Sequence, residues 1–180
     1  SYQLRGNQNR RYSKDGIVLP ITLNLRRYRM MKVIKEKFVV IGKEGSTSDG
    51  DGFIQKLWDD ADSHFSEIAH LAKRDAKGSI VGIWGAMSDS SRSFKPWEDG
   101  FRKGLYLAGV ECDDHAEAPD GWTKWIVPGY EYMVAENHKG VFEKIIRQMS
   151  EDGISLAGAV HDYTDPATGK SYLYFPIREV

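Results

Sequence analysis

The sequence predicts an α+β fold in which a β-α-β-β unit occurs twice, giving an antiparallel sheet, two helices and a central ligand cleft. Two observations carry this prediction. The order of β-rich runs and helical periodicities in the first half of the chain recurs in the second half. In addition, 180 residues with 41% hydrophobic and 28% charged side chains suffice for a globular core. A tandem repeat of this kind implies two similar halves related by a pseudo-twofold axis, with a groove between them.

The first half supplies one strand, one helix and two further strands. Residues 33–42 form the first predicted strand, because its β-rich run ends at Gly42. Apolar residues then recur at three- and four-residue steps, which predicts an amphipathic helix over 53–73. Strands are expected at 80–87 and 105–112, and the segment between them is a polar loop.

The second half repeats this order. A strand-like segment over 122–135 is interrupted by the turn Pro128-Gly129. A helix over 141–151 follows, with an apolar stripe that ends before Asp152-Gly153. Two strands at 154–163 and 170–177, joined by a hairpin turn, complete the second unit.

Residues 1–30 are expected to form a basic leader or linker ahead of a domain at 31–180. The first 37 residues hold ten Lys or Arg against two acids, whereas acids outnumber bases in the remainder. Residues 17–25 fit a short strand or an extended connector. A basic arm on an acidic body fits either contact with nucleic acid or a solvated linker, and both interpretations remain open.

Several functional classes lack their sequence signals. The chain shows no long apolar run or secretory signal, and its single cysteine cannot form an intrachain disulfide, so a cytoplasmic protein without membrane contact is expected. No phosphate-binding loop or Gly-x-Ser-x-Gly motif occurs. The histidines are poorly spaced for a metal, and Cys112 lies between Glu111 and Asp113, which disfavour a thiolate. We therefore expect no metal and no cofactor.

Aromatic residues are unusually abundant, with five Trp, nine Tyr and seven Phe. Alternation along strands places Tyr130 with Tyr132 on one face, and Tyr172 with Tyr174 on one face. One face of the sheet packs under the helices, so rings on the other face would line a groove for flat organic ligands, and an acid among them would attract cations. The alternative is that these rings pack into the core. The candidate ligand-binding residues are Trp84, Trp97, Tyr106, Glu111, Trp125, Tyr132, His161, Tyr163 and Tyr174.

Four segments in order resemble motifs of the GyrI-like family, the effector-binding domain of AraC-type and MerR-type transcription regulators. The resemblance runs from about Met31 to Ile177. Its segments are Phe38-Val39-Val40-Ile41-Gly42, Tyr106-Leu107-Ala108-Gly109-Val110-Glu111, Pro128-Gly129 with Tyr132, and Tyr174-Phe175-Pro176-Ile177.

This resemblance implies a two-repeat fold with a central cleft for small, often aromatic or cationic, compounds. Many family members carry a glutamate two residues before a tyrosine on the strand after the second helix. Here His161 occupies that position, followed by Asp162 and Tyr163. Residues 16–25 and 31–33 also resemble the connector of AraC-type regulators. The chain has no helix-turn-helix pair, so DNA would be bound only through a separate domain.

The sequence thus favours the effector-sensing domain of a regulator, and two other functions remain open. Some GyrI-like proteins that this sequence resembles are hydrolases that open the cyclopropane ring of DNA-alkylating compounds. In that case, the rings would hold the substrate and Glu111 or His161 would assist proton transfer. A protein-interaction module that inhibits an enzyme would need no pocket. A homodimer is compatible with each of these functions.

Overall fold

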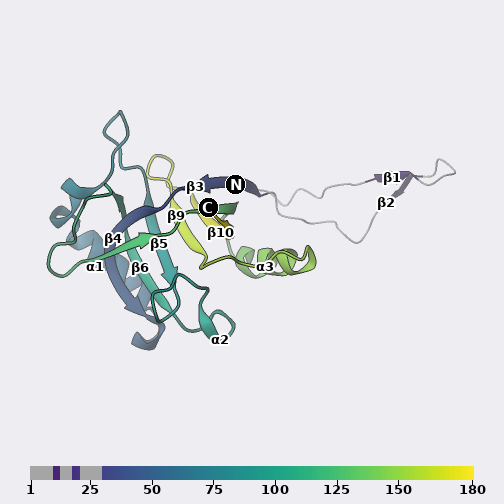
Figure 1. Ribbon diagram of the computed structural model, residues 1–180, viewed down its shortest axis with the longest axis horizontal. Coiled ribbons are helices and arrows are strands. Elements are labelled where there is room, and N and C mark those ends of the chain that lie inside the picture. The colour runs from purple at the N-terminus through teal and green to yellow at the C-terminus, as the bar shows by residue number, and fades with distance from the viewer. Residues whose placement is uncertain (1–9, 13–17, 21–29) are drawn as a thin grey trace.

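The computed structural model describes residues 10–12, 18–20 and 30–180 (Figure 1). Two short strands near the start, β1 (Arg10–Tyr12) and β2 (Val18–Pro20), pair with each other in an antiparallel sheet of their own. The rest of the leader expected at 1–30, namely residues 1–9, 13–17 and 21–29, lies outside the described residues, and this includes most of the connector expected at 17–25.

The main sheet is antiparallel and has eight strands in the order β3-β8-β10-β9-β5-β6-β4-β7. The strands are β3 (Met31–Lys35), β4 (Phe38–Ser46), β5 (Ile83–Ser88), β6 (Leu105–Cys112), β7 (Thr123–Val127), β8 (Tyr130–Glu136), β9 (His161–Thr164) and β10 (Ser171–Glu179). The helices are α1 (Phe53–Ser63), α2 (Glu98–Phe101) and α3 (Val141–Glu151), with 3-10 turns η2 (Thr47–Asp49), η3 (Phe65–Glu67) and η4 (Ala69–Leu71). The sheet is curled, and the predicted α+β fold is confirmed.

The strand order is symmetric about the central pair of β9 and β5. Equivalent positions on the two sides are taken by β10 and β6, then β8 and β4, and finally β3 and β7. Each half of the chain therefore runs strand, strand, helix, strand, strand. The first strand of each half pairs with the other half, because β3 adds to β8 and β7 adds to β4. The halves are thus joined by an exchange of strands.

A continuous antiparallel ribbon links the two ends of the curled sheet. The register that pairs Lys35 with Tyr130 continues after two residues as the pairing of Phe38 with Val127. This brings the bend between β3 and β4 opposite the bend between β7 and β8. A Cβ atom on Gly129 would lie only 3.1 Å from the Lys37 nitrogen, so glycine permits the close approach of the two bends.

Strand alternation divides the apolar residues between two faces. The face under α1 holds Val39, Ile41, Val110 and Cys112, and the face under α3 holds Ala135, Leu173 and Phe175. The opposite face, here called the aromatic face, carries Phe38, Val40, Trp84, Leu107, Trp125, Val127, Tyr130, Tyr132, Tyr172 and Tyr174. Most of these rings are buried against one another, so the aromatic face fills the inside of the curl.

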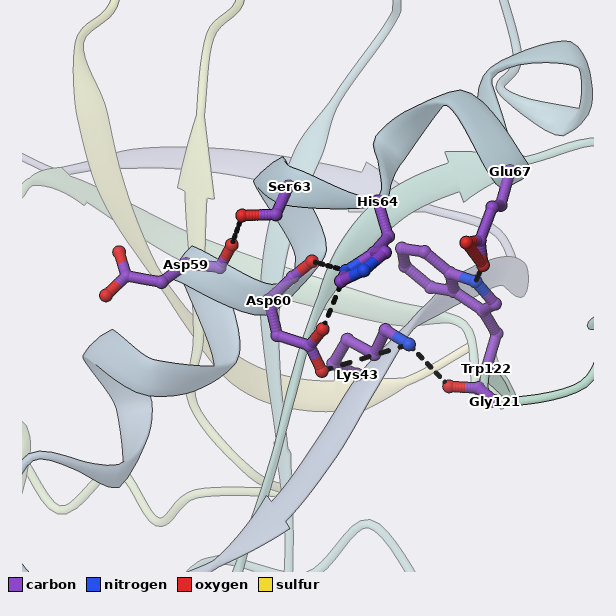
Figure 2. Close-up of polar contacts among 8 residues, drawn as sticks. All are labelled: Lys43, Asp59, Asp60, Ser63, His64, Glu67, Gly121 and Trp122. Carbon is purple, nitrogen blue, oxygen red and sulfur yellow. Dashed lines mark hydrogen bonds and ion pairs between the residues drawn. The ribbon is translucent and has the colours of Figure 1, made fainter.

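Helix α1 ends at Ser63, ten residues before the predicted end. The Ser63 hydroxyl donates to the Asp59 carbonyl, and the His64 ring contacts both the carbonyl and the carboxylate of Asp60 (Figure 2). These side chains compete for the last helical carbonyls. The 3-10 turns that follow still direct Phe65 and Ile68 to the core, which explains why the apolar pattern continues past the helix end.

Other boundaries differ from the prediction as well: the strand expected at 33–42 is divided by a bend into β3 and β4, and β5 begins at Ile83. The strand expected at 154–163 pairs only from His161, since the preceding residues bond irregularly: Ala157 donates to the Pro176 carbonyl and Ala159 to that of Phe94. The short helix α2 lies within the predicted polar loop. Helix α3 agrees with its predicted range and buries Val141, Ile145 and Met149.

None of the described helices combines the length and the apolar character that crossing a lipid bilayer requires.

Candidate ligand-binding cleft

A cleft of about 390 Å³ opens at one end of the aromatic face. It lies where β3 and β6 end and where β5 begins, beside β9 and β10. Three aromatic and three charged residues contribute to its wall, namely Trp84, Tyr163, Tyr174, Lys35, Lys73 and Glu111. The cleft therefore combines flat apolar surfaces with charged groups, as small-molecule sites commonly do.

The three rings contact one another around Trp84. The Trp84 ring centre lies 4.8 Å from that of Tyr163 and 5.0 Å from that of Tyr174, and the two tyrosines are 5.6 Å apart. Burial raises the pKa of Tyr174 to about 12, so its hydroxyl stays neutral near pH 7. The Tyr163 hydroxyl donates to the Val81 carbonyl. The rings thus form a wall held partly by hydrogen bonds.

Glu111 is the buried acid of the cleft. Its carboxylate accepts a hydrogen bond from the Trp84 indole nitrogen at 3.2 Å and pairs with the Lys35 ammonium at 3.0 Å. The Lys73 ammonium lies farther away, at 4.0 Å. Glu111, Trp84 and Lys35 are called the Glu111 triad below. Because its side chain is only 6% exposed, Glu111 depends on these partners for compensation of its charge.

Lys35 also lies against the aromatic rings. Its ammonium is 4.4 Å from the ring centre of Phe38 and 5.7 Å from that of Trp84. Both separations fall within the range of cation–π attraction. A positive charge supplied by the chain itself therefore occupies the place between the rings and the carboxylate.

A second group of the same composition lies near the other end of the aromatic face. The Glu44 carboxylate accepts a hydrogen bond from the Trp125 indole nitrogen at 2.8 Å, and the Arg92 guanidinium binds it through two nitrogens. These three residues are called the Glu44 triad. The Phe94 ring packs edge-on against Trp125 at 5.7 Å and covers this end.

The loop that carries Arg92 and Phe94 is held in place by Asp89. The Asp89 carboxylate accepts hydrogen bonds from the Ser91 hydroxyl and from backbone nitrogens, including that of Ser93. The Phe94 carbonyl accepts from the Ala159 nitrogen, which ties the loop to the other half. Arg92 and Phe94 adopt the left-handed backbone region, with φ of 56° and 58°. The loop is thus fixed over the Glu44 triad despite its unfavourable backbone.

His161 and Tyr132 lie on the aromatic face but inside it, away from the cleft wall. The Met87 backbone nitrogen donates to His161 Nδ1, so the proton of the neutral ring is on Nε2. Burial lowers the pKa of His161 to about 3. Neither His161 Nε2 nor the Tyr132 hydroxyl has a hydrogen-bond partner among the described residues. Both groups are fully buried in the protein interior.

Tyr106 and Trp97 lie outside the cleft. The Tyr106 side chain points to the helix-covered face, where its hydroxyl donates to Asp162 at 2.7 Å and accepts from the Trp58 indole. Burial raises the pKa of Asp162 to about 6. Trp97 donates to the Leu105 carbonyl and lines a separate apolar cavity of about 280 Å³ beside α3.

The structure therefore groups four of the nine candidate residues at the cleft and distributes the others. Trp84, Glu111, Tyr163 and Tyr174 line it. Trp125 belongs to the covered end. Lys35 and Lys73 were missed by the sequence reasoning. Lys35 could have been found in the sequence, because it alternates with Val33 on a strand next to aromatic residues. Lys73 was assigned to the helix predicted at 53–73, whereas α1 ends at Ser63.

The described residues contain no assembled hydrolytic centre of the common kinds. His64 and Asp60 pair on the surface of α1, but the neighbouring Ser63 hydroxyl is turned to a backbone carbonyl (Figure 2). Burial raises the pKa of the Cys112 thiol to about 11, which disfavours a nucleophilic thiolate. Within residues 30–180, no group of three or more His, Cys, Asp or Glu side chains is placed to hold a metal ion.

The Lys43 ammonium belongs to the same outer surface and is held by three partners. It donates to the Gly121 carbonyl at 2.7 Å, lies 3.8 Å from Asp60, and sits 4.2 Å above the Trp122 ring centre (Figure 2). The Trp122 indole in turn donates to Glu67. These contacts fasten the helical segment to the sheet and belong to the packing of the first half.

No family model matches the sequence, and no curated protein does either. Solved structures do resemble it. The protein SAV2435, solved with bound tetraphenylphosphonium, has a TM-score of 0.52 at 12% identity, over 83% of this chain and 94% of that one. The C-terminal domain of EcmrR has a TM-score of 0.57 at 9% identity, over 85% and 99% of the two chains.

EcmrR in its complex with DNA has a TM-score of 0.58 at 9% identity, over 85% of this chain and 58% of the longer EcmrR chain. At such identities the likeness concerns the fold. That fold is the one implied by the four sequence motifs: this chain has the fold of GyrI-like effector-binding domains.

Proposed function

We propose that the chain binds a small organic molecule with an aromatic ring in the cleft of Trp84, Tyr163 and Tyr174, and that it acts as the effector-sensing domain of a transcription regulator. One observation carries this proposal: three mutually contacting rings border a cavity of about 390 Å³ that also contains charged groups. A cavity of this size suits a compound of about two fused rings. Aromatic faces and edges favour a flat ligand.

Binding without turnover is favoured by the state of the polar groups. Glu111 is already engaged by Trp84 and Lys35, and burial raises the pKa of both tyrosines. A binding site needs only these surfaces, whereas a hydrolase needs a group that activates water. The ligand in SAV2435 and the DNA in the EcmrR complex are properties of those proteins, and they support a sensing role here.

The basic leader supports an arrangement of the AraC type. Its resemblance to the connector of such regulators fits a DNA-reading domain that is separate from this chain. Ten basic residues within the first 37 would then lie near the DNA backbone. Sequence-specific contacts would belong to the separate domain.

A fluorescence titration tests the cleft. We expect neutral 2-naphthamide to quench tryptophan emission with micromolar affinity, because a ligand of this size stacked on rings gains roughly that much binding energy. Trp84→Phe should remove most of the quenching. Trp122→Phe is the matched control, since Trp122 lies on the helix-covered face. This variant should lose the emission of Trp122 but keep the ligand-induced quenching of the remaining tryptophans.

A folded protein that shows no quenching with neutral, anionic or cationic two-ring probes would overturn the proposal. Mass spectrometry of the ligand after prolonged incubation gives a second readout. An unchanged ligand supports a sensor. A product that has gained one water would favour the hydrolase.

A further inference from the structure

We propose that the ligand recognised by the cleft is an aromatic anion, such as a two-ring carboxylate, whose acid group bridges Lys35 and Lys73. This inference rests on the proposed small-molecule function and specifies the chemical class of the ligand. It follows from the position of Lys35, the charges around the cleft and the anchoring of Lys73.

The Lys35 ammonium already occupies the position in which a cationic ligand would bind. The Lys35 ammonium lies 3.0 Å from the Glu111 carboxylate and 4.4 Å from the centre of the Phe38 ring. A bound organic cation would seek the same two kinds of partner. To reach them, it must first expel Lys35. It would then gain contacts that the chain already makes, so little net affinity remains.

The charges lining the cleft favour an anion. Two ammonium groups, Lys35 and Lys73, face one carboxylate, Glu111, among the described lining residues. Lys35 and the Trp84 indole both contact Glu111 Oε1, and Glu111 Oε2 lies 4.0 Å from the Lys73 ammonium. The imbalance leaves about one positive charge for an incoming group to neutralise.

Lys73 is held at the mouth by its backbone. Its nitrogen donates to the Glu111 carbonyl at 2.9 Å, and its carbonyl accepts from the Val81 nitrogen at 3.0 Å. Its side chain is 49% exposed and that of Lys35 is 26% exposed. Each ammonium has three N–H donors, and Glu111 uses only part of this capacity. A carboxylate can therefore bind both lysines while its rings stack on Tyr163 and Tyr174.

A matched series of two-ring probes tests this inference on the full chain: 2-naphthoate, neutral 2-naphthamide and the N-methylquinolinium cation. We expect the wild type to bind 2-naphthoate at least about tenfold more tightly than either other probe, which is the scale of one charge-assisted contact. Titration calorimetry and tryptophan quenching measure the affinities.

Substitution of Lys35 should invert the preference of the cleft for the anionic over the cationic probe. Lys35→Met keeps the aliphatic stem and removes the charge, so 2-naphthoate should lose about tenfold in affinity while the quinolinium gains access to Glu111. Lys32→Met is the control, because Lys32 is an exposed residue of the same strand that does not line the cleft. It should leave all three affinities unchanged.

The outcomes separate the two proposals. If none of the probes binds, the small-molecule function itself fails. If the probes bind and the quinolinium binds the wild type as tightly as 2-naphthoate, the cleft remains a ligand site and the anion inference is wrong. The same holds if Lys35→Met and Lys32→Met weaken 2-naphthoate equally, because the effect then reflects overall charge. A circular-dichroism spectrum of each variant establishes that it is folded.

Discussion

The two ends of the aromatic face carry the same chemical groups and differ in what covers them. Both the Glu111 triad and the Glu44 triad consist of a carboxylate, an indole N–H donor and a basic side chain. At the Glu44 end, Phe94 packs over the indole and a loop tied to the other half holds it there. At the Glu111 end, a cleft of about 390 Å³ remains.

Under the proposed function, the triad alone would not suffice for a ligand site, because both ends of the aromatic face carry one. At the Glu44 end, the Phe94 ring covers the carboxylate, the indole and the cation, so these groups contribute to packing. The same groups become available to a ligand where no loop fills the remaining space. Loop residues 89–97 therefore cover the Glu44 end and leave the Glu111 end open.

Removing either indole should have the largest effect and tests whether the two triads are equally structural. Trp84 and Trp125 are 2% and 4% exposed. Trp84→Ala and Trp125→Ala should each lower the free energy of unfolding by about 3–5 kcal/mol, because each leaves a cavity in a packed core. Urea denaturation measures the loss. A cost below about 1 kcal/mol for Trp125→Ala would mean that the Glu44 end is not a core at all.

The next largest effect should come from two titrating residues of β9, His161 and Asp162, which make the free energy of unfolding depend on pH. The pKa of Asp162 is raised from 3.8 to about 6, so its stabilising contribution is present at low pH and is lost as pH rises through about 6. The pKa of His161 is lowered from 6.5 to about 3, so its contribution is present above 6.5 and is lost as pH falls. Adjacent residues of β9 therefore oppose each other in mildly acidic solution.

Asp162→Asn tests this opposition. The variant keeps an acceptor for the Tyr106 hydroxyl but loses the stabilisation that the wild type gains in acid. Its free energy of unfolding should then fall more steeply than that of the wild type between pH 6.5 and 4, by roughly 2–3 kcal/mol over this range. Urea denaturation at several pH values measures the slope. Parallel profiles for the two proteins would show that Asp162 does not titrate in this range.

A smaller effect is expected from neutralising each carboxylate. Glu44→Gln should cost about 1–2 kcal/mol, since it breaks a two-nitrogen contact with Arg92. Glu111→Gln should cost less, because Lys35 can turn towards solvent, but it should strengthen the binding of 2-naphthoate several-fold. Calorimetric titration of both variants separates stability from binding. An equal change in 2-naphthoate affinity would remove the distinction between the two ends.

The smallest effect concerns α2, the short helix that follows the loop over the Glu44 triad. Asp99 adopts the left-handed region with φ of 51°, and its ion pair with Arg102 is exposed. Asp99→Gly should therefore leave stability unchanged or raise it by up to about 1 kcal/mol. Asp99→Ala retains the backbone conformation and serves as the control, so it should be less stable than the glycine variant. Thermal unfolding measures both, and the reverse order would show that the backbone is not strained.

Local rules predicted much of the fold and the orientation of its tyrosines. The faces of Tyr130, Tyr132, Tyr172 and Tyr174 follow from alternation along a strand, which needs no knowledge of the strand's partner. The same rule separates Tyr106 from Glu111, because five positions along a strand place two residues on opposite faces. Helix α3 was predictable because its apolar stripe stops before Asp152-Gly153, where the helix also ends.

The composition of the cleft could not be predicted in this way. Lys35 reaches Glu111 only because β3 pairs with β8 and the ribbon then bends into β4. That pairing joins residues almost a hundred positions apart. The covering of Trp125 by Phe94 depends on a loop whose backbone is uncommon for these residue types. The early end of α1 depends on side chains that compete for its carbonyls.

The exchange of strands also makes the two halves mechanically inseparable. Each half lends its first strand to the other, and β5 also pairs with β9, so two pieces cut within the segment 113–121 would still be joined by three strand pairings. Separating them would require β3 to leave β8, β7 to leave β4 and β5 to leave β9. The segment 113–121 is therefore one connection between the halves among several, because three strand pairings also fix their register.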